Sequence, residues 1–92
     1  SMIRLNVFIQ VSEENRPGRI GDAKELVEKS LKDNGCIAYD IFESATRSDV
    51  FDDFETWKDA EPYQDHEKAE HFVTLVPKLQ GLGAMKLEKF TF

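Results

Sequence analysis

The sequence contains little cysteine, no long apolar run and no excess of basic residues. Its single cysteine, Cys36, excludes an internal disulfide and a cysteine-rich zinc module. No apolar stretch approaches the roughly 18 consecutive residues that a membrane helix needs. The segment Met2 to Leu5 also lacks the charged and apolar pattern of a signal peptide. We therefore expect a cytoplasmic protein with no membrane partner.

The charge of the chain argues against nucleic acid as a partner. Its 12 basic and 18 acidic residues give a net charge of −6. The basic residues are spread singly along the chain from Arg4 to Lys89, so no basic patch is visible. Such a surface repels phosphate backbones, and we expect no nucleic-acid binding.

What the sequence does have is an aromatic-rich chain of the length of one domain. We assign that domain to residues 2–92, with Ser1 interpreted as a remnant of tag removal. Seven Phe, two Tyr and one Trp are generous for the small core that such a chain can build. The excess suggests an internal pocket, a subunit interface, or both.

Hydrophobic periodicity predicts four strands and two helical regions. Alternating apolar residues indicate strands, whereas apolar residues three and four apart indicate helices. The predicted elements are a strand over Met2–Val11, a helix that starts at Asp22 and closes at Asn34-Gly35, strands over Cys36–Ser44 and Val50–Lys58, an interrupted helix over Asp59–Leu82 and a strand over Ala84–Phe92. The order β-α-β-β-α-β at this length specifies an α+β fold, a ferredoxin-like sandwich.

Local signals set the expected ends of the helices. Pro17 and Gly18 form a predicted turn, after which Asp22 caps the first helix as part of a capping box. Gly35 supplies the left-handed residue that closes this helix. In the second helical region, Pro77 is expected to end or kink the helix because it lacks a backbone N–H group.

The sheet of this fold has one face that its helices cannot cover. That face carries candidate Phe and Trp residues and needs a partner, most economically a second copy of the chain. We therefore expect a homodimer, built as a dimeric α+β barrel.

No strong catalytic motif is present, because the chain has no phosphate-binding glycine loop, no nucleophile elbow and no His-x-x-x-His motif. The residues that could carry chemistry are Asn6, Tyr39, Glu55, Trp57, Tyr63, His66 and His71. His66 and His71 are five positions apart, which on a continuous helix places them roughly 140° apart. We expect that they cannot bind one ion together, and we predict no metal.

The histidines, Trp57 and Glu55 each have a structural interpretation beside a functional one. One histidine would pack between helix and sheet against a backbone carbonyl, or an imidazole would face a pocket and deprotonate a phenol. Trp57 would belong to the core, or would donate its indole N–H to a quinone oxygen. Glu55 would form a salt bridge or face solvent, as most of the acidic segment 49–55 would, or it would orient His66 or His71.

Three further residues leave similar alternatives open. Asn6 would lie on a solvated strand edge, or its amide would hold a substrate oxygen in a pocket. Tyr39 would pack in the core, which we favour, or would take part in the chemistry of a pocket. Cys36 is interpreted as a small buried apolar residue, because no base that would activate its thiol is evident.

Three segments together resemble the antibiotic biosynthesis monooxygenase (ABM) family of small dimeric α+β proteins. The family pattern is a Gly-Cys pair that opens the second strand, a Glu-x-Trp that ends the third, and two histidines five apart in the next helix. The matching segments are Asn34–Asp40, Phe54–Asp59 and His66–Phe72. The resemblance covers nearly the whole chain.

The resemblance implies a dimer whose subunits oxidise quinols or polyphenols with molecular oxygen, without flavin, metal or haem. An electron-rich phenolate would react with oxygen itself, while the protein supplies deprotonation, orientation and a dry cavity. Carried over by position, His66 or His71 would be the acid or base, and Trp57 and Asn6 would hold substrate oxygens. The pocket would be lined by Tyr39, Glu55, Tyr63 and Phe72.

Two other branches of the family fit the sequence less well. Haem-degrading members use an axial histidine at a position that falls near Val76 here, and valine cannot ligate iron. Members that process a phosphorylated quorum-sensing sugar have Tyr in place of Trp57, and the acidic surface disfavours such a substrate. The alternatives to an oxygenase are an enzyme that isomerises or degrades a small hydroxycarbonyl compound, and a non-catalytic binding dimer.

Overall fold

A computed structural model describes residues 1–11, 14, 16–80 and 85–92 of the chain. The elements are β1 (Ile3–Gln10), α1 (Arg16–Ser30), β2 (Cys36–Glu43), β3 (Val50–Trp57), α2 (Ala60–Lys68), α3 (Glu70–Gln80) and β4 (Met85–Thr91). The predicted order of strands and helices is confirmed, with the second helical region divided into α2 and α3. Within the described ranges, every helix is too short or too polar to cross a membrane.

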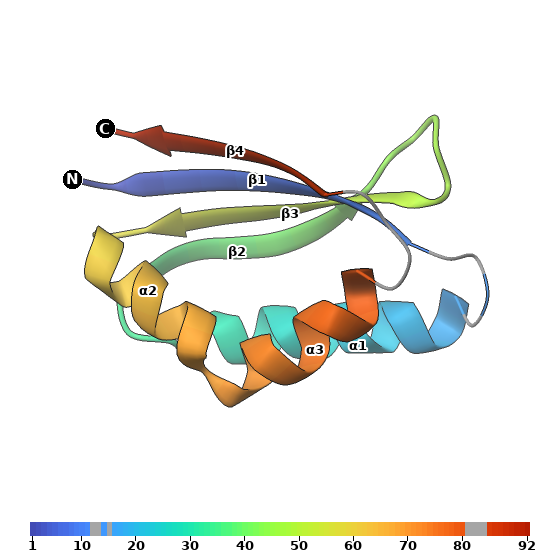
Figure 1. Cartoon of the computed structure of the whole chain (residues 1–92), viewed down its shortest axis with the longest axis horizontal. Coiled ribbons are helices and arrows are strands. Elements are labelled where there is room, and N and C mark those ends of the chain that lie inside the picture. Colours follow the sequence, from blue (N-terminus) through green and yellow to red (C-terminus); the bar gives the residue numbers. More distant parts are fainter. Residues whose placement is uncertain (12–13, 15, 81–84) are drawn as a thin grey trace.

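The strands form one antiparallel sheet in the order β2-β3-β1-β4. All three helices lie against the same face of this sheet, with α1 and α3 side by side (Figure 1). This arrangement is the ferredoxin-like α+β sandwich that the sequence predicts.

The core lies between the sheet and the helices. Alternate residues of β1 point into it, because successive side chains of a strand face opposite sides of the sheet. The buried apolar residues of the main cluster are Ile3, Leu5, Ala23, Leu26, Tyr39, Trp57, Leu75 and Leu79. They come from three strands and two helices, so one contiguous core joins both layers.

The opposite face of the sheet, which we call the outer face, carries several aromatic rings. Residues directly opposite each other in a ladder share a face, and Asn6 pairs with Phe54 while Arg4 pairs with Phe90. Phe42 lies on the same face, with its ring centroid 6.5 Å from that of Phe54. Phe42 and Phe90 are each 52% exposed. The expected Phe residues are therefore present on the face away from the helices, whereas the expectation of Trp57 there is wrong, because Trp57 lies in the core on the helix side.

The first helix begins earlier than the sequence predicts. It starts at Arg16, so Pro17 and Gly18 lie in its first turn and Asp22 lies in its interior. Proline is tolerated in a first turn because the N–H groups there have no partner within the helix. The Pro-Gly pair was therefore a helix start and not a turn, and the prediction of a cap at Asp22 is wrong.

Gly35 adopts the expected left-handed conformation, but in a different role. Its φ is +76°, and it lies in the turn between α1, which ends at Ser30, and β2. The Cys36 N–H donates to the carbonyl of Asp33 across this turn. A Cβ atom at Gly35 would lie 2.5 Å from the ring of Pro62. Glycine here thus allows both the turn and the close approach of α2.

The break in the second helical region lies at Ala69 and not at Pro77. Ala69 has φ −67° and ψ 148°, an extended conformation that ends α2 at Lys68. The helix α3 then runs through Pro77 to Gln80, so the expectation that Pro77 ends it is wrong. Because the chain changes direction at Ala69, α2 and α3 are separate helices that carry His66 and His71 respectively (Figure 1).

Candidate active site

His66 occupies the centre of a cluster of aromatic side chains. Its side chain is fully buried under α2. The centroid of its ring lies 4.6 Å from that of Trp57, 5.4 Å from that of Tyr39 and 5.2 Å from that of Phe72. The fold therefore brings together one predicted catalytic histidine and three of the predicted aromatic site residues.

A carboxylate that sequence reasoning missed joins the two histidines. Oδ2 of Asp33 lies 2.7 Å from Nδ1 of His66 and 2.7 Å from Nε2 of His71. The two rings converge because Ala69 interrupts the helix between them. The expectation that the two histidines cannot meet at one point assumed a continuous helix, and it is wrong. The expected backbone carbonyl is also wrong, because the partner of Nδ1 of His66 is the Asp33 carboxylate.

Glu55 is buried on the other side of the His66 ring. Its Oε1 accepts a hydrogen bond of 2.9 Å from Nε1 of Trp57 and lies 3.8 Å from Nε2 of His66. The solvent-facing assignment of Glu55 is therefore wrong, and the alternative that Glu55 orients a histidine stays a prediction, with His66 the histidine that it faces. The indole N–H of Trp57 donates to Glu55 in this structure, and so it is not free to donate to a substrate oxygen.

A second buried carboxyl group lies next to Glu55 on β3. The hydroxyl of Tyr39 donates to Oδ2 of Asp53 over 2.9 Å, and Asp53 is 4% exposed. Burial, reinforced by the charge of Glu55, raises the pKa of Asp53 well above its ordinary value. Burial also raises the pKa of Glu55. Strand alternation could have predicted that both acids are buried. It places Asp53 and Glu55 on the same face of β3 as Trp57.

The remaining predicted residues divide between the site and the outer face. Tyr63 packs 6.1 Å from Trp57 by ring centroids, and burial raises the pKa of its hydroxyl. Asn6 lies on the outer face of the sheet, opposite Phe54, so this subunit does not bring it to the histidines. Burial, followed by nearby carboxylates, raises the pKa of the Cys36 thiol to about 11, which suits a packed thiol better than a nucleophile.

Access to the histidine pair comes from the His71 side. The His66 side chain has no exposed surface, whereas 14% of the His71 side chain and 20% of the Asp33 side chain are exposed. A hollow of about 200 Å³ between α1 and α3 has His71, Thr74 and Leu75 in its wall. A solute can therefore reach His71 without unfolding the aromatic cluster.

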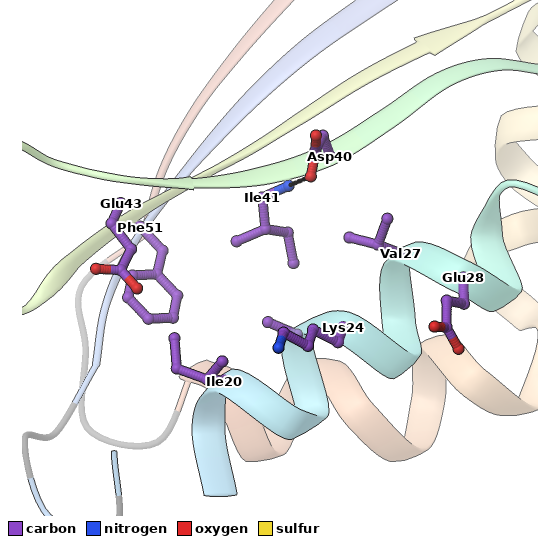
Figure 2. Close-up of a pocket in the computed structure, with 9 residues that line it drawn as sticks. Ile20, Lys24, Val27, Glu28, Asp40, Ile41, Glu43 and Phe51 are labelled. Carbon is purple, nitrogen blue, oxygen red and sulfur yellow. Dashed lines mark hydrogen bonds between the residues drawn. The ribbon is translucent and has the colours of Figure 1, made fainter. Parts of the chain in front are cut away.

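A larger hollow of about 360 Å³ lies between α1 and β2. Figure 2 shows Ile20, Val27, Ile41 and Phe51 pointing into it, with Lys24 beside them. The residues in its wall include no histidine and none of the residues that the sequence singles out. It offers apolar room, but the group best suited to acid–base chemistry is the histidine pair.

This arrangement of groups is suited to proton transfer. An imidazole that donates one ring N–H to a carboxylate keeps its other nitrogen as an acceptor, which is the geometry of an oriented general base. The Asp33 carboxylate fixes both rings at once. The surrounding aromatic rings of Trp57, Tyr39 and Phe72 exclude water from the His66 side of the pair.

Comparison with known proteins identifies the family. The family model for antibiotic biosynthesis monooxygenase matches residues 2–78. The Bacillus subtilis protein named "Putative monooxygenase YcnE" is 34% identical over 87 residues, which cover 95% of this chain and 92% of YcnE.

Two of the solved structures that are similar in fold illustrate the range of sequence identity. A conserved protein of Bacteroides thetaiotaomicron, described as a possible oxidoreductase, is 59% identical, with a TM-score of 0.90 over 100% of this chain and 98% of that one. SnoaB of Streptomyces nogalater, a cofactor-independent oxygenase, has a TM-score of 0.84 at 10% identity over 99% of this chain and 92% of its own. With the family model matched across most of its length, this chain belongs to the antibiotic biosynthesis monooxygenase family.

Proposed function

We propose that this protein is a cofactor-independent monooxygenase that oxidises a quinol-like or polyphenolic small molecule with molecular oxygen. Its family supports an oxygenase activity, and SnoaB, with the same fold, is a cofactor-independent oxygenase. The observation that carries the proposal is the Asp33 carboxylate, which holds the two imidazoles beside a cluster of aromatic rings.

The electron balance of such a reaction needs no external reductant. One quinol and one O₂ give one hydroxyquinone and one water. One oxygen atom replaces a ring hydrogen, the O–O bond breaks, and the second oxygen leaves as water with two hydrogens. The quinol supplies all four electrons. The protein must therefore remove a phenolic proton, return a proton to the departing oxygen and keep bulk water away.

His71 is the base that a substrate can reach. Its Nε2 faces Asp33, so its Nδ1 is the ring nitrogen available to accept a phenolic proton. The buried His66 binds the same Asp33 oxygen from the other side and thus acts as a positioning residue. Trp57 and Glu55 support His66 from behind, since the indole N–H is bound to Glu55.

Oxygen uptake by the purified protein tests this function. We expect uptake faster than autoxidation with at least one member of a panel of hydroquinones and naphthols, in buffer treated with a chelator. His71→Gln should lower the rate at least about 100-fold, the usual contribution of a general base. Gln64→Ala, on the exposed side of α2, is the matched control and should keep the rate of the unaltered protein.

Two outcomes count against the proposal. Uptake that never exceeds autoxidation across the panel would remove the oxygenase function. Uptake that is unchanged in His71→Gln would remove the base assigned here while leaving an oxygenase of another mechanism.

We also propose that the functional unit is a homodimer joined through the outer face of the sheet. Phe42, Phe54 and Phe90 lie on that face, and two of them are half exposed. Arg4 stacks its guanidinium 5.4 Å from the Phe54 ring and donates to the Thr56 hydroxyl, which orders the centre of this face. A flat aromatic surface of this kind is typical of a contact between copies.

A further inference from the structure

Asp33, His66 and His71 are three different potential metal ligands that already point at one place. Their nearest ligand atoms, one carboxylate oxygen and two ring nitrogens, all lie within 4.8 Å of one another. Each of the two nitrogens is 2.7 Å from Oδ2 of Asp33. A tetrahedral ion with bonds of about 2.0–2.2 Å holds its ligand atoms about 3.3–3.6 Å apart. To admit one, the two N···O distances must open by about 0.6–0.9 Å, and the two ring nitrogens, which lie within 4.8 Å of each other, must reach the same separation.

The surroundings of His66 supply the support that metal-bound histidines usually have. Nε2 of His66 is buried and has no hydrogen-bond partner among the described residues, while Oε1 of Glu55 lies 3.8 Å away. If the His66 Nδ1–H group donates a hydrogen bond to Asp33, the lone pair of Nε2 faces a carboxyl oxygen of Glu55. If Nδ1 binds a cation, the proton moves to Nε2 and faces Glu55, which gives a carboxylate–histidine–metal arrangement.

The charge around the three ligands and their access to solvent also suit a cation. Asp33 and His71 are partly exposed, and the charged residues in the wall of the hollow beside His71 are Glu70 and the ion pair of Glu25 with Lys29. The chain has a net charge of −6. Three protein ligands leave at least one coordination position for water.

We propose that Asp33, His66 and His71 form a binding site for one divalent transition-metal ion of the Zn²⁺ type. Two imidazoles and one carboxylate are a ligand set that zinc and related first-row ions favour. The ion would bind Nε2 of His71, the nitrogen that faces Asp33, and the ring proton would then stay on Nδ1, the nitrogen proposed as the base. A bound ion therefore removes the proposed base and switches turnover off.

Calorimetric titration of the chelator-treated protein with Zn²⁺ tests the site, together with the visible absorption of Co²⁺ added in its place. We expect one ion per chain at micromolar concentrations. Asp33→Asn and His71→Gln should each weaken binding at least about tenfold, because each removes a ligand. Glu55→Gln, which keeps an acceptor for the Trp57 N–H, should weaken it about tenfold through His66.

Asp65→Asn and Cys36→Ser are the matched controls. Asp65 is an exposed carboxylate on α2 outside the wall of the hollow, and the thiol of Cys36 is not one of the three ligands, so neither change should alter the affinity. Binding that is absent, or that is equal in Asp33→Asn, His71→Gln and the unaltered protein, would overturn the proposal. Because binding is measured without substrate, this result is independent of whether oxygen uptake is found.

Discussion

Asp53 and Glu55 are buried carboxyl groups on one face of β3, and burial raises the pKa of each. A carboxyl group whose pKa is higher in the folded chain than in the unfolded chain contributes stability at low pH. That contribution is lost as the pH rises through the folded pKa. We therefore predict that the free energy of unfolding falls as the pH rises above the ordinary carboxyl pKa of about 4, by at most about 1.4 kcal/mol per pH unit for each group.

Asp53→Asn tests this prediction, since it removes one titrating group and keeps an acceptor for the Tyr39 hydroxyl. At about pH 8 the variant should be more stable than the unaltered protein, with a shallower pH dependence in urea unfolding. Asp65→Asn, at an exposed position on α2, is the control and should leave the slope unchanged. Lower stability at every pH, with the original slope, would contradict the argument.

Residue by residue, the sequence named most of the side chains that surround His66 but not the carboxylate at which the two histidines meet. Strand alternation correctly placed Glu55 and Trp57 on one face. The same alternation, with Leu5 pointing into the core, would have placed Asn6 on the outer face and removed it from the site. The sequence did not identify Asp33 as a site residue, because Asp33 lies in a turn, 33 residues from His66 and 38 from His71. No local pattern reports a contact of that separation.

At the scale of elements, two glycine substitutions should change stability in opposite directions. One is in the turn that precedes β2, and the other is within α1. Gly35→Ala places a side chain at φ +76° and 2.5 Å from Pro62, which we expect to destabilise the fold by about 2–4 kcal/mol. Gly21→Ala lies within α1 with nothing within 4 Å, and it should stabilise the fold by about 0.5–1 kcal/mol. Urea unfolding of both variants checks the pair, and equal stabilities would show that the turn does not need glycine.

The ends of the helices were the least predictable part of the fold. Pro17 and Pro77 were both interpreted as breakers, yet one lies in the first turn of α1 and the other within α3. The actual break is at Ala69, although alanine has the highest intrinsic helix propensity of all residues. Its extended backbone lets α2 and α3 pack separately on the sheet, so tertiary packing overrides local preference here. The convergence of the histidines depends on this one residue.

For the whole molecule, the element order and the two-layer architecture followed from periodicity because only a few topologies suit that order at this length. The helices bury one face of the sheet and leave the aromatic outer face in water (Figure 1). That imbalance is what a sequence can reveal about assembly. It indicates that a surface needs covering, whereas the partner must be found by experiment.

The homodimer predicts a mass of twice the chain in sedimentation velocity at micromolar concentration. Phe42→Asp and Phe90→Asp, made together, should shift the protein to the monomer, because each lost ring removes about 2 kcal/mol of apolar burial and introduces a charge. Both positions are half exposed in the single chain, so the fold itself should survive. Val73→Asp, at an exposed apolar position on α3, should remain dimeric. If the unaltered protein sediments as a monomer, or if the double variant remains a dimer, the contact does not use the outer face.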